Sequence, residues 1–134
     1  MPYHELKHEA LTKRIIGCAM KVHSFLGHGY PEKIYQRALK VEFDKALLKS
    51  QCEAPKDIYY EGIWVGLRRL DILVEEIVLI ELKATSELNS ADFNQIINLL
   101  RVFDIEVGLL INFGKSTLEF KRFANTRPIR MPNK

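Results

Sequence analysis

Apolar residues recur every three to four positions near the start of the chain, which is the spacing of a helix with one buried side. The pattern predicts a first helix over about the first 25 residues, ended by the glycines of Gly27-His28-Gly29. Pro31 favours the first turn of a second helix, from about Glu32 to Leu47. A third helix is predicted from about Ala91 to Phe103, with Asn89-Ser90 as its N-terminal cap.

Strand patterns occupy the middle and the end of the chain. Residues 51–60 are interrupted by Pro55, so we expect an irregular or edge strand there, and a turn at Glu61-Gly62 leads into the strand IWVGL. The run VGLLINF is apolar like a strand buried on both faces, and LEFKRFA alternates like a last, more exposed strand. A helix between two strands indicates a crossover and a mixed sheet.

The stretch LRRLDILVEEIVLIELKAT, residues 67–85, predicts a β-hairpin with charged residues at its open end. Side chains alternate between the two faces of a strand, and the even-numbered positions of 70–74 and 78–82 are all apolar, so we expect that face to meet the core. A three-residue loop at 75–77 keeps this face intact by pairing Val74 with Val78 and Ile72 with Ile80.

The same register places Asp71 opposite Glu81, with Cβ atoms about 5 Å apart. Two carboxylates this close do not both ionise without a cation beside them, and the candidates are Lys83, Arg69 or a bound metal ion. Oxygen ligands of this kind suit Mg²⁺ or Mn²⁺. The alternative that the pairing leaves open is a cross-strand ladder of charges on a solvated face.

The amino-acid composition indicates a globular protein of a single domain. With 47% apolar and 28% charged residues, the 134-residue chain is expected to form a single domain over residues 1–134, with its core at about 8–124. No apolar run reaches the about 20 residues of a membrane span, and the N-terminus lacks the apolar segment of a signal peptide, so we expect a cytoplasmic protein without membrane contact. The basic tail at 125–134 either follows a phosphate backbone or keeps the terminus solvated.

Two motifs together resemble a known family. Asp71, followed by Glu81-Leu82-Lys83 on the next strand, resembles the D…(D/E)-x-K signature of the PD-(D/E)XK nuclease superfamily. The sequence GYPEKIY, Gly29 to Tyr35, resembles the pattern that names the GxxExxY proteins, and the resemblance covers about residues 8–124. It implies an α/β (α+β) fold with a restriction-endonuclease-like core, in which a mixed β-sheet is flanked by helices in the order α-β-β-β-α-β.

The resemblance also implies a metal site. Asp71 and Glu81 would bind Mg²⁺ or Mn²⁺, together with the backbone carbonyl of Leu82. Lys83 would orient the attacking water rather than act as the general base. Phosphodiester hydrolysis fits this arrangement, because it needs a cation that neutralises charge developing on the phosphate and lowers the pKa of water.

Two more residues enter through the resemblance. Glu32 resembles the extra acidic residue that many such nucleases contribute, which makes it a candidate catalytic residue and a further metal ligand. Gln95 resembles a catalytic-site glutamine on the following helix in part of the superfamily. The chain departs from the pattern at Leu70, where the signature has Pro, and at Leu99, where that branch often has Tyr; the second departure removes an expected substrate contact near Gln95.

The implied function is a Mg²⁺-dependent nuclease that hydrolyses DNA, with RNA as the second candidate substrate and a homodimer as a candidate assembly. The competing class is a catalytically silent module that keeps the fold and binds nucleic acid or protein. The intact set of Asp71, Glu81, Lys83 and Glu32 favours catalysis. Residues 4–8 spell H-E-x-x-H, a zinc-peptidase motif, but no third zinc ligand is evident.

Several aromatic and histidine side chains are expected to be structural. His23 lies on an apolar helix side and is expected to be a hydrogen-bonded core residue, and Tyr35 a core residue whose hydroxyl is tied to a partner. Tyr59, Tyr60 and Trp64 flank the hairpin, and packing in the strand core is favoured over base stacking for them.

Overall fold

The computed structural model describes residues 8–125. Within them, three helices and seven strands follow one another along the chain: α1 (Glu9–Leu26), α2 (Glu32–Lys45), β1 (Ser50–Cys52), β2 (Pro55–Tyr60), β3 (Ile63–Arg69), β4 (Ile72–Val74), β5 (Val78–Lys83), α3 (Ser90–Phe103), β6 (Val107–Asn112) and β7 (Glu119–Ala124). In this part of the chain, no helix combines the length and the apolar character that crossing a bilayer requires.

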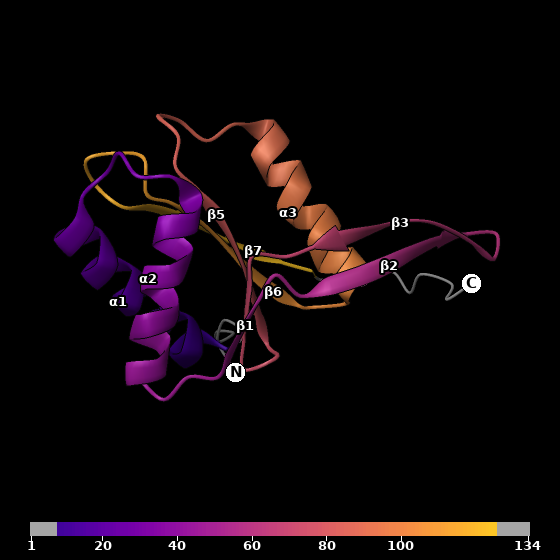
Figure 1. The fold of residues 1–134 in the computed structure, drawn as a ribbon, viewed down its shortest axis with the longest axis horizontal. Coiled ribbons are helices and arrows are strands. Elements are labelled where there is room, and N and C mark those ends of the chain that lie inside the picture. The colour runs from indigo at the N-terminus through magenta and orange to yellow at the C-terminus, as the bar shows by residue number, and fades with distance from the viewer. Residues whose placement is uncertain (1–7, 126–134) are drawn as a thin grey trace, which may run out of the picture.

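Five strands form one mixed sheet in the order β1-β4-β5-β6-β7. β5 and β6 run parallel with α3 between them in the chain, and the other neighbours are antiparallel, which confirms the predicted crossover. β6 is buried along its whole length, as predicted for VGLLINF, and β7 is partly exposed. Figure 1 shows α1 and α2 together on one side of the sheet and α3 on the other.

Each face of the sheet has its own hydrophobic core. The core under α1 and α2 includes Ile15, Leu39, Phe43, Ile72, Val74, Val78, Ile80 and Leu82. The core under α3 includes Leu70, Leu79, Ile96, Leu99, Leu100 and Leu110. The predicted apolar face is therefore confirmed for β4 and β5 but wrong for Leu70, because the chain leaves strand geometry between Arg69 and Ile72 and the alternation of faces is broken there.

The β4–β5 hairpin has the predicted register, with Val74 opposite Val78. Its loop turns without glycine, since Glu75 and Glu76 take left-handed φ angles of 54° and 57°. Glu75 is held on both sides by Lys49: its N–H donates to the Lys49 carbonyl at 2.8 Å, and the Lys49 N–H donates to its Oε2 at 2.7 Å. These hydrogen bonds offset part of the cost of the left-handed conformation.

The segment predicted as one irregular or edge strand over residues 51–60 divides into two strands. β1 is the edge of the main sheet, whereas β2 pairs with β3 in a separate two-stranded sheet, termed the β2–β3 arm (Pro55–Arg69). The arm projects away from the helices and the main sheet (Figure 1). Trp64 and Tyr60 are 54% and 66% exposed, so the expectation that they pack in a strand core is wrong.

Candidate functional site

Asp71 and Glu81 meet at the open end of the β4–β5 hairpin. Glu81 belongs to β5, and Asp71 immediately precedes β4. The Asp71 N–H donates to Glu81 Oε2 at 3.2 Å, and the Leu82 N–H donates to Asp71 Oδ2 at 2.7 Å. The two carboxyl groups also lie close enough to shift each other's pKa. The structure thus brings together the two acids that the sequence places opposite each other.

The environment of this pair disfavours two negative charges. Burial raises the pKa of both carboxyl groups, and the neighbouring Asp71 charge adds to burial in raising the pKa of Glu81 to about 8. Burial and the repulsion between the two charges therefore make Glu81 hold its proton more tightly than an ordinary carboxyl group does. Its donors are all oxygens in a partly buried place, and such a donor set fits a hard divalent cation.

Lys83 follows on β5, but its ammonium group pairs with another residue. Its Nζ lies 3.4 Å from Asp92 Oδ1 at the start of α3. Asp92 is itself fixed by a capping box: its N–H donates to Asn89 Oδ1 at 3.1 Å, and the Asn89 N–H donates to Asp92 Oδ2 at 3.0 Å. The cap was predicted from sequence and the pairing with Lys83 was not, because no local spacing shows that the first turn of α3 returns to the end of β5.

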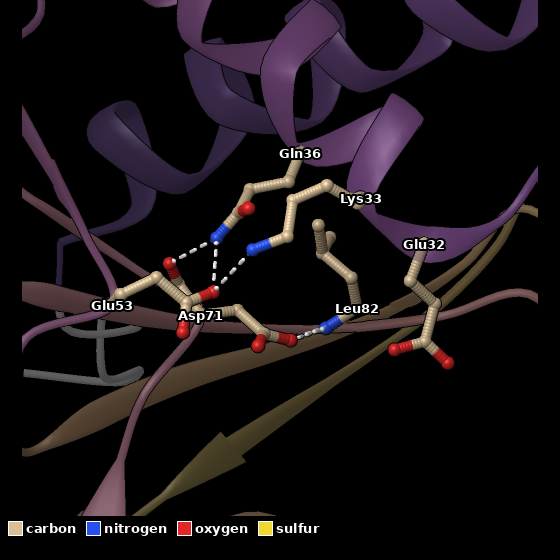
Figure 2. A pocket seen from close by; sticks show the side chains of 6 residues that line it. All are labelled: Glu32, Lys33, Gln36, Glu53, Asp71 and Leu82. Carbon is tan, nitrogen blue, oxygen red and sulfur yellow. Dashed lines mark hydrogen bonds and ion pairs between the residues drawn. The ribbon is translucent and has the colours of Figure 1, made fainter.

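Glu32 begins α2 and reaches the chain just beyond Lys83. The backbone N–H of Ala84 is near enough to its carboxylate to lower the pKa of Glu32. Burial raises the pKa of Glu32, the Lys83 cation lowers it, and the Asp71 charge raises it further, so the three side chains influence one another electrostatically. In Figure 2, Glu32 extends from the helix on the side of Leu82, away from Glu53.

A pocket of about 150 Å³ opens beside Asp71, lined by Glu32, Lys33, Gln36, Glu53, Asp71 and Leu82. Figure 2 shows Lys33 and Gln36 reaching from α2 towards Glu53. Gln36 Nε2 donates to Glu53 Oε2 and to the Asp71 carbonyl, both at 2.9 Å, and Lys33 Nζ lies 3.2 Å from Glu53 Oε2. The Gln36 and Lys33 hydrogen bonds lower the pKa of Glu53. Gln36 and Glu53 belong to no motif and Lys33 occupies a variable position of GYPEKIY, so sequence reasoning missed all three pocket residues.

Gln95 lies on α3 and is exposed, and it is not among the residues that line the pocket. It follows Asp92 by three residues, which places it one turn along the same side of the helix. The structure therefore brings Asp71 and Glu81 together and places Glu32 and Lys83 near enough to act on them electrostatically, whereas Gln95 does not line the pocket.

No group of three or more His, Cys, Asp and Glu side chains is arranged to hold a metal ion within residues 8–125. The acidic centre is accordingly the Asp71–Glu81 pair, with Glu32 separate from it. Residues 4–7 of the H-E-x-x-H motif and residues 126–134 of the basic tail lie outside the described residues.

Asn112 and Gly114 hold the chain that follows Lys83. Asn112 is fully buried; its Oδ1 accepts from the N–H groups of Thr85 and Gly114, both at 3.0 Å, and its Nδ2 donates to the Thr85 carbonyl at 2.9 Å. The Phe113 N–H donates to the Lys83 carbonyl at 2.8 Å. A Cβ atom on Gly114 would lie 2.3 Å from the Thr85 nitrogen, so this close approach of two backbones requires glycine.

Tyr35 closes the connection between α1 and α2. Its ring stacks on Phe113 at 4.4 Å between centroids, and its hydroxyl donates to the Gly27 carbonyl at 2.6 Å. His23 is also buried, with Nε2 2.8 Å from the Lys115 carbonyl. The expected structural roles of Tyr35 and His23 are confirmed.

Comparisons with known proteins agree with this architecture. Residues 9–123 match the family model described as the PD-(D/E)XK nuclease superfamily. A solved structure titled "Crystal structure of SSO0001" matches with a TM-score of 0.56 and 17% identity, over 92% of this chain and 61% of the other. At this identity the likeness supports the fold alone, and it agrees with the expected mixed sheet flanked by helices. No curated protein matches the chain.

Proposed function

Because the chain belongs to the PD-(D/E)XK nuclease superfamily, we propose that it is a divalent-metal-dependent nuclease that hydrolyses phosphodiester bonds in DNA. The observation that carries the proposal is the Asp71–Glu81 pair, in which burial raises the pKa of both carboxyl groups and so disfavours their negative charge. The cations that the sequence offered as counter-ions also have other partners: Lys83 lowers the pKa of both acids less than burial raises it and pairs with Asp92, and the exposed Arg69 donates to the Glu53 carbonyl at 3.4 Å. A metal ion is the remaining candidate for neutralising the pair.

In this proposal Asp71 and Glu81 would hold Mg²⁺ or Mn²⁺ with the backbone carbonyl of Leu82, and Glu32 would supply a further carboxylate. The bound ion supplies positive charge at the phosphate and lowers the pKa of a water molecule. Lys83 acts as a hydrogen-bond donor that orients the attacking water, and the Asp92 carboxylate, 3.4 Å from its Nζ, helps to hold the ammonium group in place. Gln95 is assigned to substrate contact along α3.

We also infer membership of the GxxExxY proteins, because each named position of that pattern has a distinct structural task. Gly29 adopts a φ of 116°, which side chains with a Cβ rarely adopt. Glu32 reaches the end of β5 at Ala84, and Tyr35 ties the preceding loop to the core. The motif thus fixes a helix start that presents a carboxylate to the site.

A cleavage assay tests the proposal. The protein is incubated with single-stranded, double-stranded and branched DNA and with single-stranded RNA, in Mg²⁺, Mn²⁺ or EDTA, next to Lys83→Ala, Glu81→Gln and a matched control, Glu76→Gln, in the exposed loop of the same hairpin. We expect metal-dependent cleavage of DNA that falls about 100-fold or more in the two site variants and is unchanged in the control.

The alternatives give different results in the same assay. Cleavage that persists in both Lys83→Ala and Glu81→Gln would come from a contaminating nuclease. Binding without cleavage by the wild-type protein, on every substrate and with either metal, would support the catalytically silent module instead.

A further inference from the structure

The β2–β3 arm has two chemically different faces. Alternate residues of β2 share a face, and residues directly opposite in an antiparallel pair share it too. One face, termed the basic–aromatic face, consists of Lys56, Ile58 and Tyr60 of β2 with their partners Arg68, Gly66 and Ile63 of β3. On the other face, the Trp64 indole N–H donates to Asp57 Oδ1 at 3.0 Å.

Two cations lie opposite each other at the base of the basic–aromatic face. Lys56 pairs directly with Arg68 across the strands, an arrangement that is unfavourable unless a counter-charge is present. Neither forms an ion pair with a carboxylate of the described residues. Arg68 instead donates to Asn98 Oδ1 on α3, and the exposed Arg101 lies three residues further along the same side of that helix. The missing counter-charge is anionic, which points to phosphate.

Apolar side chains lie at the tip of the same face. Tyr60 and Ile63 are opposite each other and are 66% and 67% exposed. Gly66, opposite Ile58, leaves open space between the cations and the tip, since a Cβ there would meet nothing within 4 Å. An exposed aromatic ring on the same face as cations is a stacking platform for unpaired bases. A duplex keeps its bases stacked internally, so the combination favours a single strand.

The arm leaves the body of the protein beside the Asp71–Glu81 pair. β3 ends at Arg69, two residues before Asp71, and Arg69 contacts the Glu53 carbonyl at the pocket. The base of the arm is therefore adjacent in the chain to the segment that carries Asp71.

We propose that the basic–aromatic face of the β2–β3 arm holds a single-stranded segment of the nucleic-acid substrate, with phosphates on Lys56 and Arg68 and a base on Tyr60. The assignment of this strand as substrate rests on the proposed nuclease function, whereas its binding is separable from cleavage. A second copy that presented the same face would bring its own Lys56 and Arg68 against these two cations, which disfavours a symmetric pair of arms as the occupant.

Binding is measured by fluorescence anisotropy in EDTA, so that no metal-dependent cleavage occurs, with a labelled single strand, a blunt duplex and a duplex with a single-stranded overhang. The wild-type protein is compared with Lys56→Ala/Arg68→Ala, with Tyr60→Ala and with Lys13→Ala/Lys21→Ala, a control that removes the same charge from exposed positions of α1. A Lys56→Arg/Arg68→Lys variant keeps both charges.

We expect the wild-type protein to prefer the single strand and the overhang over the blunt duplex. The double alanine variant should bind the single strand about tenfold more weakly and lower the slope of log affinity against log salt by about 1.4, since two phosphate contacts are lost. Tyr60→Ala should weaken binding about fivefold or more. The α1 control and the charge-retaining variant should bind like the wild-type protein.

Equal binding by the wild-type and arm variants, no binding by the wild-type protein, or a preference for the blunt duplex would overturn the inference. So would sedimentation data in which the arm variants lose self-association but keep nucleic-acid binding, because the occupant would then be a second copy. Arm-dependent binding without cleavage by the wild-type protein in Mg²⁺ or Mn²⁺ would reject the nuclease function alone. Metal-dependent cleavage combined with binding that does not depend on the arm would reject strand binding by the β2–β3 arm and leave the nuclease function standing.

Discussion

Substituting Glu81 with glutamine should remove a specific pH dependence of stability from the metal-free protein. Glu81 has a pKa of about 8 in the folded state against 4.5 for the ordinary carboxyl, mainly because of burial and the neighbouring Asp71 charge. A carboxyl with a raised folded-state pKa binds its proton more tightly in the folded state. Its stabilising contribution is therefore complete below about pH 4.5 and is lost as the pH rises through about 8.

The expected magnitude follows from the two pKa values. Between pH 4.5 and about 8 the folded state binds one more proton than the unfolded state does. The free energy of unfolding therefore falls by about 1.4 kcal/mol for each pH unit, which totals about 5 kcal/mol. Glutamine at position 81 mimics the protonated acid and keeps a hydrogen-bond donor for Asp71. The variant should thus match the wild-type protein near pH 4.5 and exceed its stability by several kcal/mol at pH 8.5.

Urea unfolding in EDTA at half-unit steps from pH 5 to pH 9 measures this difference, with Glu76→Gln as the control from the exposed hairpin loop. Addition of Mg²⁺ at 100 times its dissociation constant should then stabilise the wild-type protein at pH 8.5 by about 2.7 kcal/mol and leave Glu81→Gln nearly unchanged. Parallel pH profiles for the wild-type protein and Glu81→Gln would refute the reasoning, because Glu81 would then have no raised pKa. A Mg²⁺ stabilisation of equal size in both proteins would show that Mg²⁺ does not bind at the Asp71–Glu81 pair.

Three further substitutions have defined outcomes. Gly114→Ala should lower the free energy of unfolding by about 1–3 kcal/mol in a urea titration and reduce cleavage, because its Cβ would collide with the Thr85 backbone; full activity would contradict this. Tyr35→Phe should cost about 1–3 kcal/mol in the same titration, because the half-buried Gly27 carbonyl loses its donor. Asp92→Asn should keep the helix cap yet reduce the cleavage rate about tenfold, because Lys83 loses its anionic partner, and a stability loss as large as that of Gly114→Ala would indicate a structural role instead.

The sequence was sufficient to predict those helix ends and strand pairings that depend on residues near one another in the chain. The register of the β4–β5 hairpin followed from requiring one unbroken apolar face, and this placed Asp71 beside Glu81. The N-terminus of α3 followed from the capping chemistry of Asn89. In each case residues a few positions apart determine the geometry, so short-range physics was sufficient.

Features that depend on contacts between distant segments were not predicted. Leu70 packs in the core under α3 rather than in the predicted core, because β3 belongs to the separate two-stranded sheet and the chain joins the main sheet only after Leu70. Nothing within residues 67–85 indicates this change of sheet. The Lys83–Asp92 pair requires the first turn of α3 to return to the end of β5. Trp64 was expected in the core because aromatic residues favour strands, but a two-stranded arm without a helix layer leaves it exposed.

The arrangement around Asp71 and Glu81 is better explained by binding than by stability. A buried pair of carboxyl groups lowers the stability of the metal-free protein as the pH approaches 8, and two apolar side chains at the end of a hairpin would not. The surroundings are nevertheless rigid, with Asn112 fully buried and hydrogen-bonded to the chain after Lys83. Groups that lower the stability of the folded protein, yet are held by rigid surroundings, are typical of sites where a bound ligand supplies the interaction that these groups lack. Here the missing interaction is positive charge, which a divalent cation would supply at the point where the β2–β3 arm would deliver a phosphate backbone.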